Sequence, residues 1–163
     1  MKIVVVSDTH VPRFAARFEL ALARIADERP ELILHCGDLT TFAATDALAA
    51  IAPVDAVGGN NDGEDIVRRY GRRKIVEPGI RIGMIHGDGS RGTTLGRALA
   101  AFAGERLDAI AFGHSHIPYL ARHGDVWVVN PGSISDKRRQ PRYSYAVFER
   151  DASGAFAPRL PYF

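Results

Sequence analysis

Three short apolar runs, separated by two helical stretches, constrain the first third of the chain more than any other feature. The runs cover residues 3–6, 32–36 and 54–57, and the helical stretches cover about residues 14–28 and 41–51. Short apolar runs of this kind are typical of buried strands. A strand–helix–strand–helix–strand order favours parallel strands joined by right-handed crossovers. The sequence therefore predicts an α/β fold.

The second half of the chain is richer in strand signals. Runs that predict strands lie at residues 74–77, 80–85, 109–112, 119–122, 126–129 and 145–149. One further helix is predicted at about residues 95–103, and His123-Gly124-Asp125 is typical of a hairpin turn. Because we find no internal repeat, low-complexity stretch or linker, we expect residues 1–163 to form one domain.

Composition excludes several classes of protein. Of the 163 residues, 46% are hydrophobic and 25% are charged, which is enough for a core and unlike a disordered chain. The single cysteine, Cys36, cannot form an internal disulfide, so the cytoplasm is the expected location. The apolar run 3–6 is too short for a signal peptide or a membrane span, and we expect no membrane association. A formal net charge of +2 is weak evidence for nucleic-acid binding.

Metal-competent side chains follow five of the predicted strands, at the point where each strand ends. In chain order these side chains are Asp8, His10, Asp38, Asn60, His86, His114 and His116. In open α/β sheets the carboxyl ends of parallel strands share one edge, and ligands bind there. His114 and His116 alternate in an extended segment, so we expect both imidazoles on one face. The sequence therefore predicts a metal centre at this edge.

Other residues of similar chemistry are expected to lie outside this centre. His35 is interpreted as a packed or supporting histidine within a strand, and His123 as an exposed turn residue. Cys36 is interpreted as a small buried hydrophobe. The basic stretch 137–142 is typical of a solvated loop, although a role in substrate or nucleic-acid binding stays open.

Five motifs in a fixed order carry a resemblance to a known family. They are Asp8-x-His10, Gly37-Asp38, Gly59-Asn60-Asn61-Asp62, His86-Gly87 and Gly113-His114-x-His116. Together they resemble the calcineurin-like metallophosphoesterase superfamily. The opening SDTHVP and the late NPGS are similar to its short, single-domain YfcE/Vps29-like branch. The resemblance covers essentially the whole chain, and it implies a four-layer αββα sandwich of two mixed β-sheets.

The resemblance also implies ligands for two divalent metal ions. One ion would take Asp8, His10, Asp38 and His116, and the other would take Asp38, Asn60, His86 and His114, so that Asp38 bridges them. The resemblance favours Mn²⁺, and this mixture of carboxylate, amide and imidazole also suits Ni, Co, Fe or Zn. Two ions about 3.5–4 Å apart neutralise a phosphate ester and supply hydroxide at neutral pH. We therefore expect hydrolysis by a metal-bridging hydroxide held by Asp38.

One position departs from the larger members of the superfamily. Those proteins carry a histidine after the motif asparagine, which is proposed to protonate the leaving group, whereas this chain has Asn61. An amide cannot donate a proton in that way, so no side-chain general acid is assigned. We expect Asn61 and Arg91 to contact the substrate. Arg13, which also lies close in sequence to a ligand loop, could contact a phosphate as well.

These observations predict a metal-dependent phosphoesterase that acts on a small phosphoester, with diesters favoured over monoesters. One alternative is a nuclease acting on DNA or RNA, which the small net charge makes the weaker hypothesis. Another is a non-catalytic protein-binding scaffold, which is the main use that Vps29 relatives make of this fold. A scaffold has no physical need for a complete ligand set. The sequence leaves homo-oligomerisation open.

Overall fold

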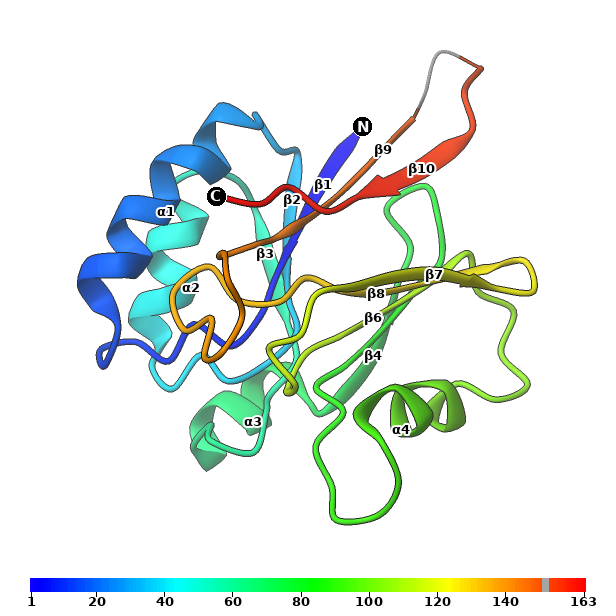
Figure 1. Cartoon of the computed structure of the whole chain (residues 1–163), viewed down its shortest axis with the longest axis horizontal. Helices are drawn as coiled ribbons and strands as arrows, with labels where there is room; N and C mark the ends of the chain where they lie inside the picture. The colour runs from blue at the N-terminus through cyan, green and yellow to red at the C-terminus, as the bar shows by residue number, and fades with distance from the viewer. Residues whose placement is uncertain (151–152) are drawn as a thin grey trace.

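Two five-stranded sheets form the centre of the molecule (Figure 1), in a computed structural model that describes residues 1–150 and 153–163. The first sheet has the order β10-β9-β1-β2-β3, and the second has the order β4-β5-β6-β8-β7. The strands of the first sheet are β1 (Lys2–Val6), β2 (Leu32–His35), β3 (Val54–Ala56), β9 (Ala146–Arg150) and β10 (Phe156–Arg159). Those of the second are β4 (Arg73–Val76), β5 (Ile82–Ile85), β6 (Ala109–Phe112), β7 (Tyr119–His123) and β8 (Val126–Asn130).

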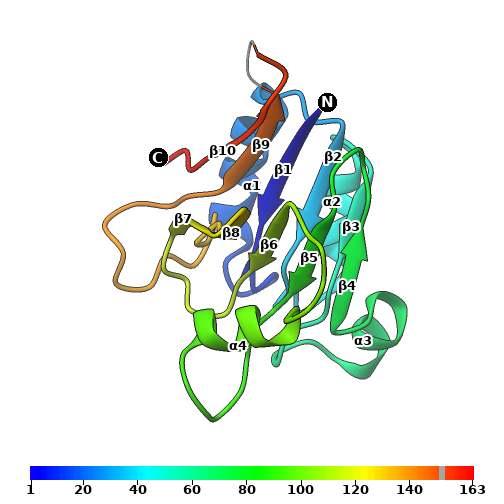
Figure 2. The same ribbon diagram turned by 90° about the vertical axis from the view of Figure 1, so that its right-hand side faces the viewer.

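Both sheets are mixed, with a parallel group of three strands in each. In the first sheet β1, β2 and β3 are parallel, while β9 pairs antiparallel with both β1 and β10. In the second sheet β5, β6 and β8 are parallel, while β4 and β7 lie antiparallel at the two edges. The parallel strands β1, β5 and β6 point toward the same edge of the molecule (Figure 2). Segments that follow these strands are therefore brought together.

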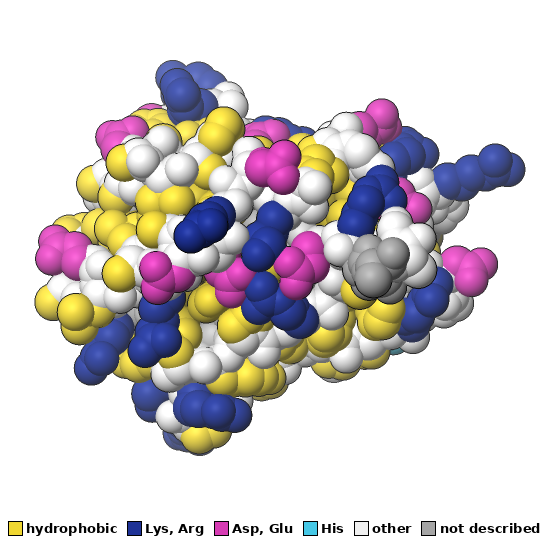
Figure 3. Space-filling model, turned by 90° about the horizontal axis from the view of Figure 1, so that it is seen from above, with side chains coloured by type: hydrophobic (Ala, Val, Ile, Leu, Met, Phe, Trp, Pro, Cys, Tyr) yellow, Lys and Arg dark blue, Asp and Glu magenta, His cyan; other side chains and the backbone are white. Residues whose placement is uncertain are grey.

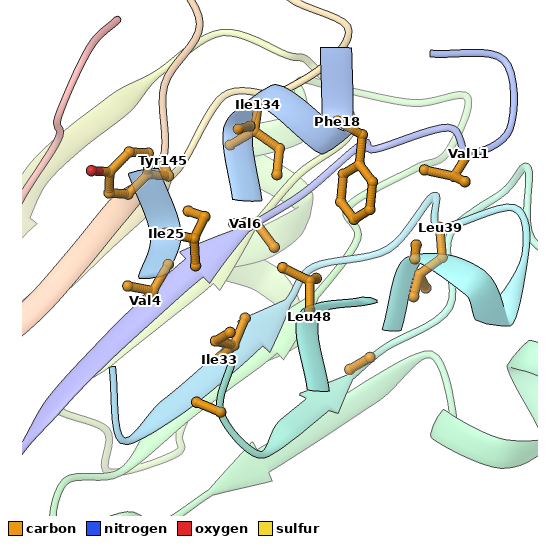
Figure 4. Close-up of a cluster of buried hydrophobic side chains, with 14 of the residues drawn as sticks. Val4, Val6, Val11, Phe18, Ile25, Ile33, Leu39, Leu48, Ile134 and Tyr145 are labelled. Atoms are coloured by element: carbon orange, nitrogen blue, oxygen red, sulfur yellow. The ribbon is translucent and has the colours of Figure 1, made fainter. Parts of the chain in front are cut away.

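The alternation of side chains along β1 shows how one strand joins two cores. Val4 and Val6 face helices α1 (Ala15–Asp27) and α2 (Phe42–Ala49), where they pack among residues such as Ile25 (Figure 4). Ile3 and Val5 point the other way and pack against the second sheet. Period-two alternation puts neighbouring side chains on opposite faces, so a strand covered on both faces reads as continuously apolar.

Helix α4 (Thr94–Ala101) covers the outer face of the second sheet. Ala98 and Phe102 pack there against Ile110 and Phe112 of β6. The intervening residues Ala109 and Ala111 face the first sheet instead. The order of layers is therefore helices, sheet, sheet, helix, which confirms the four-layer αββα sandwich of two mixed β-sheets.

Two elements were absent from the sequence prediction: helix α3 (Glu64–Tyr70) and strand β10. Helix α3 has seven residues, and Ile66 is the one that it buries fully, so it offers almost no apolar periodicity. Strand β10 is an edge strand that contains Pro158, a residue that argues against a strand when read from sequence. The hairpin predicted at His123-Gly124-Asp125 is confirmed between β7 and β8: Gly124 and Asp125 are its turn residues, and His123 is the exposed last residue of β7.

The surface opposite the converging strand ends carries both signs of charge. Seen from above, basic and acidic side chains are interspersed over this face, and neither sign forms a continuous field (Figure 3). Such a surface gives no strong electrostatic attraction to a polyanion. Among the residues that the structure describes, no helix combines the length and the apolar character that crossing a bilayer requires.

An ionic cluster ties β10 to the end of α1. The carboxylate of Glu28 accepts hydrogen bonds from the Tyr145 hydroxyl at 2.9 Å and from the Arg159 guanidinium at 3.1 Å and 2.5 Å. Burial acts to raise the pKa of Glu28, but these donors outweigh it and hold that pKa below its ordinary value of 4.5. Glu28 therefore stabilises the folded chain as a carboxylate.

We predict that Glu28→Gln lowers the free energy of unfolding at pH 7 by about 1.5–3 kcal/mol, the range for hydrogen bonds to a charged group. The folded-state pKa of Glu28 is lower than its unfolded value, so this stabilisation is present above the unfolded pKa. It is lost as the pH falls through the folded pKa. Urea unfolding of both proteins should show a difference that is largest at pH 7 and shrinks below about pH 5.

Glu64→Gln is the matched control. Glu64 forms an exposed ion pair with Arg68, whose N···O distance is 3.8 Å. Loss of such a pair should change the free energy of unfolding by less than about 0.5 kcal/mol at either pH. A Glu28→Gln effect of the same size at pH 7 and at acidic pH would contradict the role given to its carboxylate.

Candidate metal centre

The seven predicted ligand positions all lie where strands of the two sheets end. Asp8 and His10 follow β1, and Asp38 follows β2 of the same sheet. His86 follows β5, and the pair His114 and His116 follows β6 of the second sheet. Asn60 lies in the turn after β3. The site therefore spans the two sheets, and each sheet contributes about half of it.

Two buried carboxylates form the middle of the site, and imidazoles surround them. His116 Nε2 lies 3.2 Å from Asp8 Oδ1, and His86 Nε2 lies 3.3 Å from Asp38 Oδ2. His86 Nε2 is also 3.9 Å from Asp8 Oδ1, and His10 Nε2 is 3.8 Å from Asp38 Oδ2. Four of these five side chains have almost no exposed area, and His10 is 9% exposed.

These side chains form two overlapping groups that could each hold a cation. One group is Asp8, His10 and His116, and the other is Asp8, Asp38 and His86. Within each group the ligand atoms lie within 4.8 Å of one another. Asp8 belongs to both groups, while Asp38 Oδ2 lies within 4 Å of a nitrogen from each of the two. Both carboxylates therefore lie between the two sets of imidazoles.

The ring of His114 lies beside this cluster, and Asn60 lies in the turn after β3, between two residues that approach Asp38. The His114 ring is 5.1 Å from the His86 ring in an edge-to-face arrangement, and its backbone N–H donates to Asp8 Oδ2 at 3.0 Å. Asn60 is exposed, and its side chain makes no hydrogen bond to the residues that the structure describes. The structure therefore brings six of the seven predicted ligands together, and Asn60 stays a prediction.

The histidines are oriented by backbone carbonyl groups. Nδ1 of His86 donates to the Cys36 carbonyl at 2.7 Å, and Nδ1 of His116 donates to the Asp136 carbonyl. Because a carbonyl only accepts, Nδ1 carries the proton in both rings, and Nε2 faces the carboxylates. A carbonyl on the distant nitrogen is the usual way in which a metal-binding histidine is held.

Two buried polar atoms in the centre lack hydrogen-bond partners among the described residues. They are Asp8 Oδ1 and His86 Nε2. These two atoms lie near each other, and Asp8 Oδ1 also lies near His116 Nε2, but neither contact has the geometry of a hydrogen bond. Leaving such atoms unsatisfied in a protein interior is costly. A cation would satisfy both, so the donor set fits a divalent metal that takes oxygen and nitrogen ligands.

Burial and neighbouring charges shift the pKa values of the carboxylates and imidazoles in this centre. Burial would raise the pKa of Asp8 and of Asp38, but the imidazoles beside them outweigh it and hold both pKa values below the usual range. Burial would lower the pKa of His86, but Asp38 and Asp8 raise it to about 9. The pKa of His10 is lowered by its burial. The carboxylates therefore stay charged and draw positive charge to the centre.

Five of the predicted ligands have left-handed backbone conformations, which non-glycine residues rarely adopt. Their φ angles are 55° for Asp8, 47° for His10, 58° for Asp38, 66° for His114 and 58° for His116. Each such residue costs of the order of 1–3 kcal/mol and persists only where its surroundings enforce it. Clustered strain of this kind is typical of functional sites. It turns side chains from separate loops toward one point.

Two glycines allow the loops to approach one another. A Cβ atom on Gly59 would lie 2.3 Å from Asp38 Oδ1, and one on Gly113 would lie 2.8 Å from Asp8 Oδ2. Contacts this short require neighbouring atoms to move, so any larger residue would displace a carboxylate of the centre.

Asp62, which the sequence analysis did not assign a role, holds the loop after β2 against its own loop after β3. It is 9% exposed, and its carboxylate accepts backbone N–H groups of Asp38 at 2.8 Å, Thr40 at 2.6 Å and Gly59 at 2.7 Å. Its place in the Asn60-Asn61-Asp62-Gly63 motif was the available signal. A turn motif does not reveal, however, which backbone groups its carboxylate will accept.

A late loop supports the centre from the other side, and the sequence analysis missed this role as well. Ser133 Oγ donates to the Asp8 carbonyl at 2.9 Å, and Ser135 Oγ donates to the Thr9 carbonyl at 2.8 Å. Asp136 Oδ2 lies 3.9 Å from His10 Nε2. The NPGS motif was the signal for this loop.

The structure separates the remaining predicted residues. Asn61 donates through Nδ2 to Asp38 Oδ2 at 2.6 Å and lines a pocket of about 380 Å³ with His10, Arg13 and Arg138. Arg91 lies in the exposed loop before α4 and does not line this pocket. Arg13 and Arg138 are therefore closer candidates for phosphate contact than Arg91, which stays a prediction.

His35 lies beside the centre and supports it from beneath. It is buried, its Nε2 is 3.0 Å from the Thr9 hydroxyl, and its Nδ1 accepts the Gly37 N–H at 3.2 Å. Burial lowers the pKa of His35 to about 3, so its ring is neutral. These contacts agree with the supporting role that the sequence suggested.

Comparison with known proteins gives a consistent family. The model of the calcineurin-like phosphoesterase superfamily domain matches residues 1–153. A probable metallophosphoesterase of Methanothermobacter thermautotrophicus is 38% identical over 82% of this chain and 77% of its own length. Another, from Methanocaldococcus jannaschii, is 40% identical over 82% of this chain and 68% of its own length.

Solved structures show the same fold. Vps29 of Chaetomium thermophilum superposes with a TM-score of 0.78 at 21% identity, covering 100% of this chain and 97% of its own. A structure described as a novel archaeal phosphodiesterase superposes with a TM-score of 0.75 at 23% identity, covering 99% of this chain and 100% of its own. The chain therefore belongs to the calcineurin-like phosphoesterase superfamily, in its short single-domain branch, and it is a metal-dependent phosphoesterase.

Proposed function

We propose that this chain hydrolyses phosphodiesters at a pair of divalent metal ions held between the two sheets. The observation that carries this proposal is the pair of unsatisfied buried atoms, Asp8 Oδ1 and His86 Nε2, each of which belongs to a group of converging ligands. Two carboxylates in a buried cluster need compensating positive charge. A phosphodiesterase of Methanocaldococcus jannaschii that is 29% identical over 81% of this chain supports the diester preference.

The ligands divide between two positions in this proposal. One ion takes Asp8, His10, Asp38 and His116, and the other takes Asp38, Asn60, His86 and His114. Asp38 is the proposed bridge because its Oδ2 lies between His10 Nε2 and His86 Nε2. When bound, the two ions neutralise the phosphate charge and lower the pKa of water so that hydroxide is available near neutral pH. We propose Mn²⁺ as the ion, with Ni, Co, Fe and Zn as the alternatives to compare.

Residues of the chain itself position the substrate in the pocket beside His10. The side chain of Asn61 donates to Asp38 and so fixes the direction of that carboxylate. Arg13 and Arg138 are exposed at the rim of the same pocket, where their guanidinium groups can pair with a phosphate oxygen. We propose that these two arginines bind the negatively charged oxygens of the scissile phosphate.

Arg138 also favours a second candidate function, hydrolysis of nucleic acid. It belongs to the basic stretch 137–142 and borders the proposed catalytic pocket. Turnover of single-stranded DNA, cyclic nucleotides and an aryl phosphodiester under the same conditions separates the two functions. Preference for DNA by more than about tenfold in kcat/KM would favour the nuclease.

We predict that Asp38→Ala and His86→Ala each lower Mn²⁺-dependent hydrolysis of bis(p-nitrophenyl) phosphate by more than about 100-fold. Even residues that only support metal ligands contribute 10–100-fold, and these two are proposed ligands. Calorimetric titration with Mn²⁺ should show that the affinity falls in parallel. Thermal unfolding in EDTA should show that both variants remain folded.

Asp46→Ala is the matched control for Asp38→Ala, because Asp46 is an exposed aspartate on α2, outside the cluster and outside the lining of the pocket beside His10. It should keep metal affinity and turnover within about twofold of the parent chain. Undiminished hydrolysis in both Asp38→Ala and His86→Ala would refute the site. Tight metal binding by the parent chain without turnover of any phosphoester would favour the scaffold hypothesis instead.

We also predict that turnover depends strongly on the leaving group, because no side-chain acid is assigned to protonate it. The amide of Asn61, which occupies the relevant position, is engaged with Asp38. Across a series of methyl aryl phosphates, log kcat should fall steadily as the pKa of the leaving alcohol or phenol rises. A flat dependence, under conditions where chemistry limits the rate, would mean that another residue supplies the proton.

A further inference from the structure

A second pocket lies at the end of β6, beside the start of α4, and the chemistry described so far does not use it. Its volume is about 460 Å³, within the range of small-molecule sites. It is bounded by the loop between β5 and α4, which extends beyond the sheet edge (Figure 1), by the start of α4 and by the segment 115–119. Ser115, which lines this pocket, lies between His114 and His116 in the chain. The pocket therefore adjoins the proposed catalytic centre.

The walls of this pocket are mainly apolar and aromatic. Leu95 and Ile117 line it together with Phe112 and Tyr119, whose rings are 6.3 Å apart and tilted by 54°. Ile117 is 53% exposed, although most large apolar side chains of the described residues are buried. An aliphatic residue at a pocket rim beside aromatic rings is the arrangement that receives a flat apolar group.

Arg97 lines this pocket, but its guanidinium group is not available to bind phosphate. Arg97 donates from Nε to the Gly87 carbonyl at 2.7 Å and from Nη1 to the Arg91 and Gly92 carbonyls at 2.8 and 3.0 Å. Its Nη2 donates to the Thr94 hydroxyl at 3.2 Å. Four of its five N–H groups are therefore already used to hold the loop. The pocket beside His10 differs, because Arg13 and Arg138 line it at its exposed rim.

We propose that the pocket formed by Leu95, Phe112, Ile117 and Tyr119 binds an aromatic substituent of the phosphoester, so that the chain selects esters with a planar ring on one side of the phosphorus. This inference rests on the proposed function and names its substrate class. A diester has two substituents, and the lining of this pocket is more apolar than that of the pocket beside His10. The ring of an aryl group and that of a nucleobase offer the same contacts here, and both are tested below.

The test compares phosphonates that carry a single substituent, so that the group entering the pocket is unambiguous. Phenylphosphonate and methylphosphonate are titrated into the Mn²⁺-loaded protein by calorimetry, and both are measured as inhibitors of hydrolysis. We expect phenylphosphonate to bind at least about tenfold more tightly, as the burial of several ring carbons should give. We also expect its heat-capacity change to be more negative, which marks burial of apolar surface.

Ile117→Ala should reduce the ratio of the affinity for phenylphosphonate to that for methylphosphonate by at least about threefold, and Ile117→Leu should restore this ratio. The ratio cancels any loss that is common to both compounds, including a disturbance of the neighbouring His116. Leu20→Ala is the matched control, because Leu20 is a 66% exposed leucine on α1 and does not line the pocket. It should leave the ratio unchanged.

Thymidine 5′-(p-nitrophenyl phosphate) and methyl p-nitrophenyl phosphate then separate the two sources of the ring. Both release p-nitrophenolate, so a higher kcat/KM for the thymidine ester, lost in Ile117→Ala, assigns the pocket to a nucleobase. Equal kcat/KM values with the phenylphosphonate preference intact assign it to an aryl group. Equal binding of the two phosphonates by a chain that hydrolyses esters would overturn this inference alone. Absence of binding together with absence of any hydrolysis would overturn both this inference and the proposed function.

Discussion

Two carboxylates, Asp8 and Asp38, lie almost without solvent contact in the middle of the candidate metal centre, and their charges govern the structure around them. An ion removed from water is costly unless opposite charge and hydrogen bonds compensate it. The chain supplies backbone N–H groups and imidazoles, but it still leaves Asp8 Oδ1 and His86 Nε2 without partners among the described residues. Because the buried negative charge is incompletely compensated, we interpret this cluster as a cation site. Sheet order, strained turns and close glycine contacts all serve to bring these groups together.

The double-sheet architecture explains how one edge can hold so many ligands. Parallel strands from two packed sheets end on the same side, so loops from both sheets meet across the interface. The left-handed residues Asp8 and Asp38 then turn their side chains inward, while Asp62 and Ser133 fix the loop backbones. The strain is tolerated because a separate loop contacts each turn. Rigid positioning of this kind is what a site for metals and for an in-line reaction needs.

Much of this arrangement could be predicted from the sequence, and the exceptions have physical causes. Strands such as β1 and β6 were found because they are buried on both faces, and the six clustered ligands were found because each follows a strand. The division into two sheets came from the family resemblance, since periodicity does not tell which strands pair. Helix α3 and strand β10 were missed because a short exposed helix and a proline-containing edge strand leave weak patterns. Asp62 and Asp136 were missed because their partners are distant along the chain: backbone N–H groups of the loop after β2 for Asp62, and the rings of His10 and His116 for Asp136.

The contacts that hold the centre connect the beginning of the chain to its last third. Asp8 accepts the N–H of His114, Ser133 donates to the Asp8 carbonyl, and Ser135 donates to the Thr9 carbonyl. These partners are separated by 106, 125 and 126 residues. Contacts of such long range form late, since the chain must close large loops before they are made. During synthesis, residues up to 135 must therefore leave the ribosome before these contacts can form, so the loops of the proposed metal centre assemble only after most of this sequence has been made.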